Sequence, residues 1–156
     1  MTTTRANEIL NILKTNFSMP QWASSARSPF QTLIVTIISQ NTAGKNTAKA
    51  FERLSNKFKI TPEALAKAET REIEDALRVA GLFRNKAKTI KHVSKIILEQ
   101  FYGSLDFVYS MPFEEARKTL LTLPGVGPKT ADVVLLFTAG KPTIPVDTHV
   151  NRVSKR

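Results

Sequence analysis

Two side chains in the last quarter of the sequence are of types that could do chemistry, Lys129 and Asp147. A neutral lysine amine attacks electrophilic carbon and forms a Schiff base, and the positive end of a helix favours the neutral amine. A carboxylate beside it stabilises positive charge that develops on a substrate. A plainer alternative remains open for each residue. Lys129 could be a charged phosphate ligand, and Asp147 could be the N-cap of a helix over 148–155.

A glycine-rich turn over 123–131 reads Leu-Pro-Gly-Val-Gly-Pro-Lys-Thr-Ala. Gly125 and Gly127, separated by Val126, let the backbone turn sharply and approach another surface closely. A proline then starts a helix whose first N–H groups, including that of Thr130, are unpaired and lie at the positive end of the helix dipole. Such a turn can bind phosphate. The alternative is that it only connects two helices efficiently.

The elements that must position these residues are predicted to be helices, because apolar residues recur at helical spacing along nearly the whole chain. A hydroxyl residue followed by proline, at Ser28-Pro29 and Thr61-Pro62, is typical of a helix start, and Gly140 of a helix end. The segment 142–146 could be a strand, but its two prolines argue against it. The pattern predicts an all-α fold.

The amino-acid composition restricts the kinds of partner and the kinds of chemistry that the protein can have. A length of 156 residues suits one globular domain, and a net charge of +10 suggests a polyanionic partner. The basic run over 84–95 is either a solvated helix face or a stripe that faces phosphate. The absence of cysteine excludes a disulfide scaffold, a cysteine zinc site and an iron–sulfur cluster held by these residues, and we predict no metal site. No apolar run is long enough to span a membrane.

The turn over 123–131 resembles the helix-hairpin-helix motif of the endonuclease III family of DNA glycosylases, within the HhH-GPD superfamily. Further segments resemble the same family in the same order: Ser-Pro-Phe at 28–30, Ser-Gln-Asn-Thr at 39–42, Gly-Leu-Phe-Arg-Asn-Lys-Ala at 81–87 and Pro-Val-Asp-Thr-His-Val-Asn-Arg-Val at 145–153. The hairpin followed by Val-Asp-Thr-His is the most specific of these features.

The resemblance implies an all-α fold of two lobes around a DNA-binding cleft. One lobe is expected to be a helical bundle over 24–140, with the hairpin motif in about 112–140. The other is expected to be partial, built from 1–23 and 141–156, because family members continue past the aspartate, many of them into a four-cysteine [4Fe–4S] loop. We therefore expect a shortened chain that is weakly active or inactive, with its apolar stripe at 9–17 exposed.

The resemblance also implies a function, base-excision repair by a DNA glycosylase with abasic-site lyase activity. Lys129 would attack the deoxyribose of a damaged nucleotide, with oxidised pyrimidines as the expected targets, and Asp147 would stabilise the developing charge. The partner would be double-stranded DNA with a damaged base or an abasic site, and the full-length protein would be a monomer in the cytoplasm or nucleoid, or in a eukaryotic nucleus. A non-catalytic helix-hairpin-helix DNA-binding module is the alternative. The family would further suggest a monovalent cation under the hairpin.

Because a duplex hides its bases, such an enzyme must extrude the target nucleotide and fill the gap. By resemblance, Gln40 and Asn41 would hydrogen-bond the orphaned partner base, and Leu82 would wedge into the opposite strand. Asn41 departs mildly from the glutamine usual in the family. The alternatives are helix capping for Asn41 and core packing for Leu82. His149 is expected to pack against neighbours or to contact phosphate.

Overall fold

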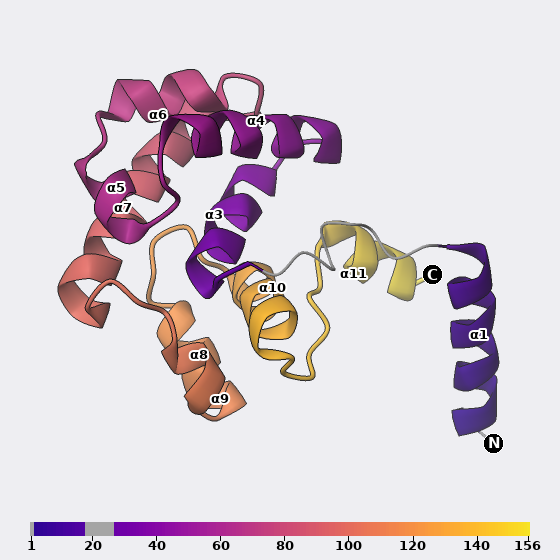
Figure 1. Cartoon of the computed structure of the whole chain (residues 1–156). Helices are drawn as coiled ribbons and strands as arrows, with labels where there is room; N and C mark the ends of the chain where they lie inside the picture. Colours follow the sequence, from indigo (N-terminus) through magenta and orange to yellow (C-terminus); the bar gives the residue numbers. More distant parts are fainter. Residues whose placement is uncertain (1, 18–26) are drawn as a thin grey trace.

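The computed structural model describes residues 2–17 and 27–156, and every regular element in those two ranges is a helix (Figure 1). The predicted all-α fold is therefore confirmed. The helices are α1 (Thr2–Asn16), α3 (Pro29–Ser39), α4 (Gly44–Lys57), α5 (Pro62–Lys67), α6 (Thr70–Leu77), α7 (Phe83–Phe101), α8 (Phe107–Ser110), α9 (Phe113–Leu120), α10 (Pro128–Ala139) and α11 (Thr148–Ser154).

Helix α3 runs through the core and contacts α4, α7 and α10. A capping box begins it: the backbone N–H of Gln31 donates to Ser28 Oγ, and the N–H of Ser28 donates to Gln31 Oε1, both at 3.2 Å. Leu33, Ile34 and Ile37 are fully buried, and each such side chain contributes about 2 kcal/mol of hydrophobic stabilisation. The end of α3, where the next residues begin, is therefore held in a fixed position.

Helices α9 and α10 flank the hairpin, and α10 packs against α3 (Figure 1). Arg117 on α9 donates from Nε to Asp132 Oδ1 of α10 at 2.7 Å and from Nη2 to Oδ2 at 3.4 Å. The Asp132 side chain is almost entirely buried, so this ion pair is shielded from water and links the two helices firmly. The start of α10, and with it the backbone of Lys129, is held by packing on two sides.

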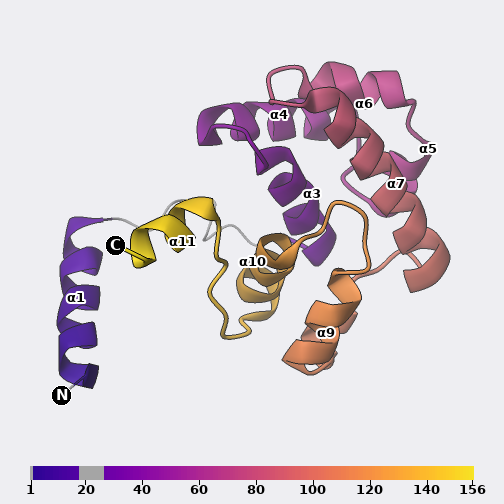
Figure 2. The ribbon, with the colours of Figure 1, turned by 180° about the vertical axis from the view of Figure 1, so that it is seen from behind.

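The helices at the two ends of the chain lie apart from this bundle in both views (Figures 1 and 2). No residue of α11 is buried. The predicted exposure of the apolar stripe at 9–17 is confirmed, since Ile12 is 62% and Phe17 is 70% exposed. The predicted boundary between residues 23 and 24 lies outside the described residues, and the division into two lobes stays a prediction.

Some sequence predictions of detail were wrong. The sequence predicts a long helix from Asn85 to Tyr102, but α7 begins at Phe83, and nothing in the sequence predicts the four-residue helix α8. The spacing of Ala48, Phe51, Leu54 and Phe58 predicts a helix that packs with these residues, but α4 begins at Gly44 and buries Thr47 and Ala50 while Ala48 stays exposed. Among residues 2–17 and 27–156, no helix has the length and apolar character needed to cross a bilayer.

Candidate functional site

The two glycines of the hairpin are needed for different reasons. Gly125 has φ +75°, which side chains rarely adopt, and a Cβ there would collide with the Thr89 side chain of α7. Gly127 has φ −95° and ψ −179°, which any residue adopts, and a Cβ there would meet nothing within 4 Å. The fold therefore requires glycine at Gly125, whereas at Gly127 only an external surface that comes close to the backbone would require it.

Exposed donors surround Gly127. Within the described residues, the backbone N–H groups of Gly125, Gly127, Lys129 and Thr130 have no acceptor. They lie where the hairpin enters α10, at the positive end of the helix dipole. The N–H of Val126 donates to Leu123 O at 3.2 Å, and the Val126 side chain is buried. The hairpin thus presents a set of free donors that suits an anionic oxygen.

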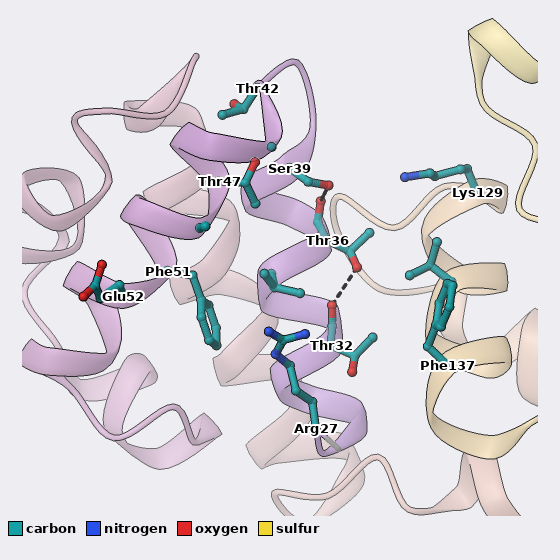
Figure 3. A pocket seen from close by; sticks show the side chains of 14 residues that line it. Arg27, Thr32, Thr36, Ser39, Thr42, Thr47, Phe51, Glu52, Lys129 and Phe137 are labelled. Carbon is teal, nitrogen blue, oxygen red and sulfur yellow. Dashed lines mark hydrogen bonds between the residues drawn. The ribbon is translucent and has the colours of Figure 1, made fainter. Parts of the chain in front are cut away.

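The side chain of Lys129 lies at one end of a groove between α3, α4 and α10, with a volume of about 460 Å³ (Figure 3). Thr32, Thr36 and Ser39 line it from α3, and apolar side chains line the α4 and α10 sides, among them Phe51, Val133 and Phe137.

Two of the groove hydroxyls are already used as donors within α3. Thr36 Oγ1 donates to Thr32 O at 2.6 Å, and Ser39 Oγ donates to Thr36 O at 2.7 Å. A hydroxyl that has donated its one proton can still accept. The α3 wall therefore offers methyl groups and acceptor oxygens to whatever enters beside Lys129.

Asp147 is the N-cap of α11, as the sequence predicted. Its Oδ1 accepts from the backbone N–H of Val150 at 2.9 Å and of His149 at 3.0 Å. These hydrogen bonds, that of Val150 first, hold the pKa of Asp147 below its ordinary value, and the charges of His149 and Lys129 lower it further. The contribution of Lys129 is the smallest of these, and Asp147 is not among the residues that line the groove beside Lys129.

His149 is not part of a packed core. Its side chain is exposed, and His149 Nδ1 lies 3.0 Å from Arg152 Nη2, one turn further along α11. An arginine and a histidine therefore lie side by side on an exposed face, an arrangement that suits contact with phosphate. The phosphate contact of His149 stays a prediction.

Asn41 and Leu82 lie at two exposed corners, each in the left-handed region, with φ +50° and φ +56°. Leu82 is 59% exposed, so the core-packing alternative is wrong. A leucine in this conformation is strained as well as exposed, and such residues concentrate at functional sites. Asn41 directly follows Gln40, the C-cap of α3, and has the left-handed conformation in which asparagine often ends a helix, whereas Ala43 is the N-cap of α4. The helix-capping alternative for Asn41 therefore stays open at the end of α3.

Gln40 faces the hairpin. Its Nε2 donates to Gly125 O at 3.1 Å and to Thr130 Oγ1 at 3.4 Å. The Thr130 side chain is buried, so Thr130 could meet a phosphate only through its backbone N–H. Gln40 therefore joins the corner after α3 to the hairpin, and its predicted contact with an orphaned base stays a prediction.

Comparisons with known proteins identify the family to which the chain belongs. A model of the HhH-GPD superfamily, described as base excision DNA repair proteins, matches residues 34–156. The chain belongs to this superfamily. Among its HhH-GPD relatives, endonuclease III of Haemophilus influenzae is 35% identical over 158 residues, covering all of this chain and 70% of that protein.

Endonuclease III of Thermotoga maritima is 40% identical over 82% of this chain but only 56% of its own length. The chain thus spans little more than half of that HhH-GPD relative. A trapped covalent endonuclease III–DNA intermediate has a TM-score of 0.80 at 32% identity, covering 99% of this chain and 68% of that one. A thermostable thymine-DNA glycosylase has a TM-score of 0.81 at 26% identity, covering 99% and 66%.

Sequence reasoning missed the groove residues and two supports of the site, Thr89 and Lys86. Thr89 sits against Gly125, and no pattern in the sequence signals that contact between distant segments. Lys86 is buried, with its side chain turned toward the corner after α3. A signal existed for it, because Lys86 falls on the same helix face as the apolar Ile90, Val93 and Ile97.

Proposed function

We propose that the chain carries the nucleophile and its partner acid of a base-excision repair DNA glycosylase with abasic-site lyase activity. The proposal concerns a protein of which this chain spans about 56% to 70% in the relatives above. The observation that carries it is the placement of Lys129, whose side chain lines a groove beside the free N–H groups of the hairpin.

The chemistry follows from these two groups. The neutral Lys129 amine attacks C1′ of the deoxyribose as the C1′–N bond breaks, and the base leaves with the bonding electrons and takes up a proton. The attached amine loses its proton and the sugar ring opens to a Schiff base. Loss of a C2′ proton then expels the 3′ phosphate by β-elimination, and water releases the lysine. The Asp147 carboxylate stabilises the positive charge on the sugar.

The surrounding surface supports engagement of a duplex. The hairpin N–H groups bind phosphate, Leu82 enters the opposite strand and Asn41 bonds the orphaned base. The groove between α3, α4 and α10 receives the extruded base. Its methyl groups can pack on a base and its acceptor oxygens can accept from the N–H donors of a base, which is compatible with an oxidised pyrimidine among other bases.

The residues that the structure describes do not fit a bound metal ion or an iron–sulfur cluster. The sequence has no cysteine to hold a [4Fe–4S] cluster, and among the described residues no group of three or more His, Cys, Asp or Glu side chains could hold a metal. A monovalent cation under the hairpin would need carbonyl oxygens as ligands. One of the hairpin carbonyls, that of Gly125, already accepts a hydrogen bond from Gln40 Nε2. We propose that the protein acts as a monomer, in whichever compartment holds the DNA.

Borohydride trapping on duplex DNA with an abasic site tests the proposal, because reduction of a Schiff base leaves a covalent adduct even when turnover is slow. We expect an adduct from the wild-type chain and from Lys118→Gln, which removes an exposed lysine of α9. Lys129→Gln should give none. Absence of an adduct from the wild-type chain would contradict the lyase proposal.

A second function is favoured by one observation, that no residue of α11 is buried. If α11 does not hold Asp147 in place, the chain could act as a non-catalytic DNA-binding module through its hairpin. Tight duplex binding by the wild-type chain, together with no adduct under prolonged trapping, would select this function.

A further inference from the structure

Lys86 is a basic residue on the inner side of α7, with only 4% of its surface exposed. Its Nζ donates to Thr42 Oγ1 at 2.6 Å and to Ile38 O at 2.8 Å. No carboxylate accepts from it among the described residues. Burying an ammonium group without a counter-ion is costly, and this burial lowers the pKa of Lys86. Because the buried ammonium group lowers the stability of the fold, we expect Lys86 to have a role other than packing.

The two acceptors belong to the corner that follows α3. Ile38 is in the last turn of α3, where backbone carbonyls lack helical partners and carry the negative end of the dipole. Thr42 is the residue after Asn41. Lys86 therefore binds the corner on both sides of Gln40 and Asn41.

The same hydroxyl joins this corner to the other one. Thr42 Oγ1 also accepts from the backbone N–H of Gly81 at 3.1 Å, directly before Leu82. A Cβ on Gly81 would lie 2.6 Å from Asn41 O, so the two corners touch and only glycine permits it. Asn41 and Leu82 are thus neighbours in space across a contact that Lys86 and Thr42 maintain.

We infer that Lys86 is a positioning residue, which through Thr42 locks the Asn41 and Leu82 corners into one two-pronged unit for entering a duplex. The inference rests on the proposed function, since it gives Asn41 and Leu82 their places in DNA. Lys86 itself touches no DNA, because it is buried. The lock holds both prongs in strained, exposed conformations before DNA arrives, so little ordering remains to be done on binding.

The experiment uses a duplex with a tetrahydrofuran abasic analogue opposite 2-aminopurine, whose fluorescence rises when the orphaned base is unstacked. With saturating wild-type chain we expect a clear rise. Lys86→Met should lose most of it while keeping thermal stability, because Met fills the space without a buried charge. Lys86→Arg should restore part. Lys91→Met is the matched control, because Lys91 of the same helix donates to Ala68 O, away from the corners.

Substitutions at Thr42 and at Gly81 keep the test valid if Lys86→Met does not fold. Thr42→Val removes the shared hydroxyl and should lower the fluorescence rise, whereas Thr42→Ser should keep it. Gly81→Ala pushes the corners apart without touching charge and should act like Lys86→Met. We expect about tenfold slower borohydride trapping on duplex DNA for the disrupted variants, and an unchanged rate on single strands.

The outcomes separate this inference from the proposed function. A full fluorescence rise in folded Lys86→Met or in Thr42→Val overturns the inference, as does a wild-type chain that binds the duplex without any rise. Loss of the rise in these variants, with no adduct from the wild-type chain, sustains the inference and rejects the lyase function.

Discussion

The proposed nucleophile and its partner acid lie in regions of very different packing. Lys129 is on α10, which packs on the buried helix α3 and is linked to α9 by the shielded Arg117–Asp132 ion pair. Asp147 is on α11, where no residue is buried and the first-turn hydrogen bonds are the main local support. The hairpin side of the site is thus preorganised by the core, and the acid side is held mainly by its own cap.

This difference in packing separates the proposed functions that the helical bundle supports from the one that it does not support. In the proposed function, phosphate binding and entry into the duplex would depend on the hairpin and the two corners, all of which the bundle supports. Stabilisation of charge on the sugar depends on the less supported side. We therefore expect this chain to bind DNA well and to turn over slowly, and the predictions below test the two sides separately.

The largest effect is expected for Gly127→Val. The side chain would fill the open space in front of the free N–H groups, so we expect about hundredfold weaker duplex binding from lost charge-assisted hydrogen bonds. Helicity and melting temperature should not change, because no protein atom lies near the new Cβ. Gly125→Ala is the contrasting variant and should lose stability first. Unchanged affinity of Gly127→Val, measured by fluorescence anisotropy, would reject the phosphate role.

Asp147→Asn should slow single-turnover trapping about tenfold, less than the hundredfold or more typical of a well-held electrostatic group. Asparagine also caps helices, so α11 should persist. Asp106→Asn, a change at the N-cap of α8, serves as the control and should leave the rate unchanged. A hundredfold loss from Asp147→Asn would mean that α11 is positioned as well as α10, and the contrast between the two regions would fail.

Leu82→Ala should lower trapping on duplex DNA about fivefold while leaving the rate on single strands unchanged, since a wedge matters only where stacking must be broken. Tyr102→Ala is a close control, because Tyr102 is exposed, lies in the same left-handed region and flanks the other end of α7. Equal loss on both substrates would remove the wedge role from Leu82.

The smallest effect is expected when the pH is lowered through the pKa of Asp147. Folding lowers the pKa of Asp147, so its carboxylate stabilises α11 above the ordinary value of 3.8, and this stabilisation is lost as the pH falls through the lower folded value. The amide proton shifts of His149 and Val150 should titrate with a midpoint below 3.8, while those of α10 stay unchanged. A midpoint at or above 3.8 would mean that the cap is absent in solution.

Local signals in the sequence were enough for most of the fold. Ser28-Pro29 and Thr61-Pro62 begin α3 and α5 as predicted, with both hydroxyls accepting from the first turn, and Gly140 ends α10. Caps are read from adjacent residues, so no tertiary information is needed. Helix α8 lacks such a cap hydrogen bond and has only four residues, which leaves no periodicity to detect.

The candidate site could be predicted only in part. Residue types and their spacing indicate the hairpin and Asp147. Lys86, in contrast, belongs to the basic run over 84–95, which the sequence allows us to interpret only as a solvated helix face or as a stripe that faces phosphate. That run divides in the structure: Lys86 and Lys91 donate to backbone carbonyls of other segments, while Arg84, Lys88 and Lys95 are exposed. Contacts between residues more than 40 positions apart, such as Lys86 with Thr42, depend on the packing of α3 against α7 and leave no local trace.

Mapping the covalent attachment site after borohydride reduction tests the central claim most directly. The wild-type chain is incubated with duplex DNA that contains an abasic site, reduced, digested and analysed by mass spectrometry. The account predicts a sugar remnant on Lys129. An adduct on another lysine or on the N-terminal amine, with Lys129 unmodified, would contradict it.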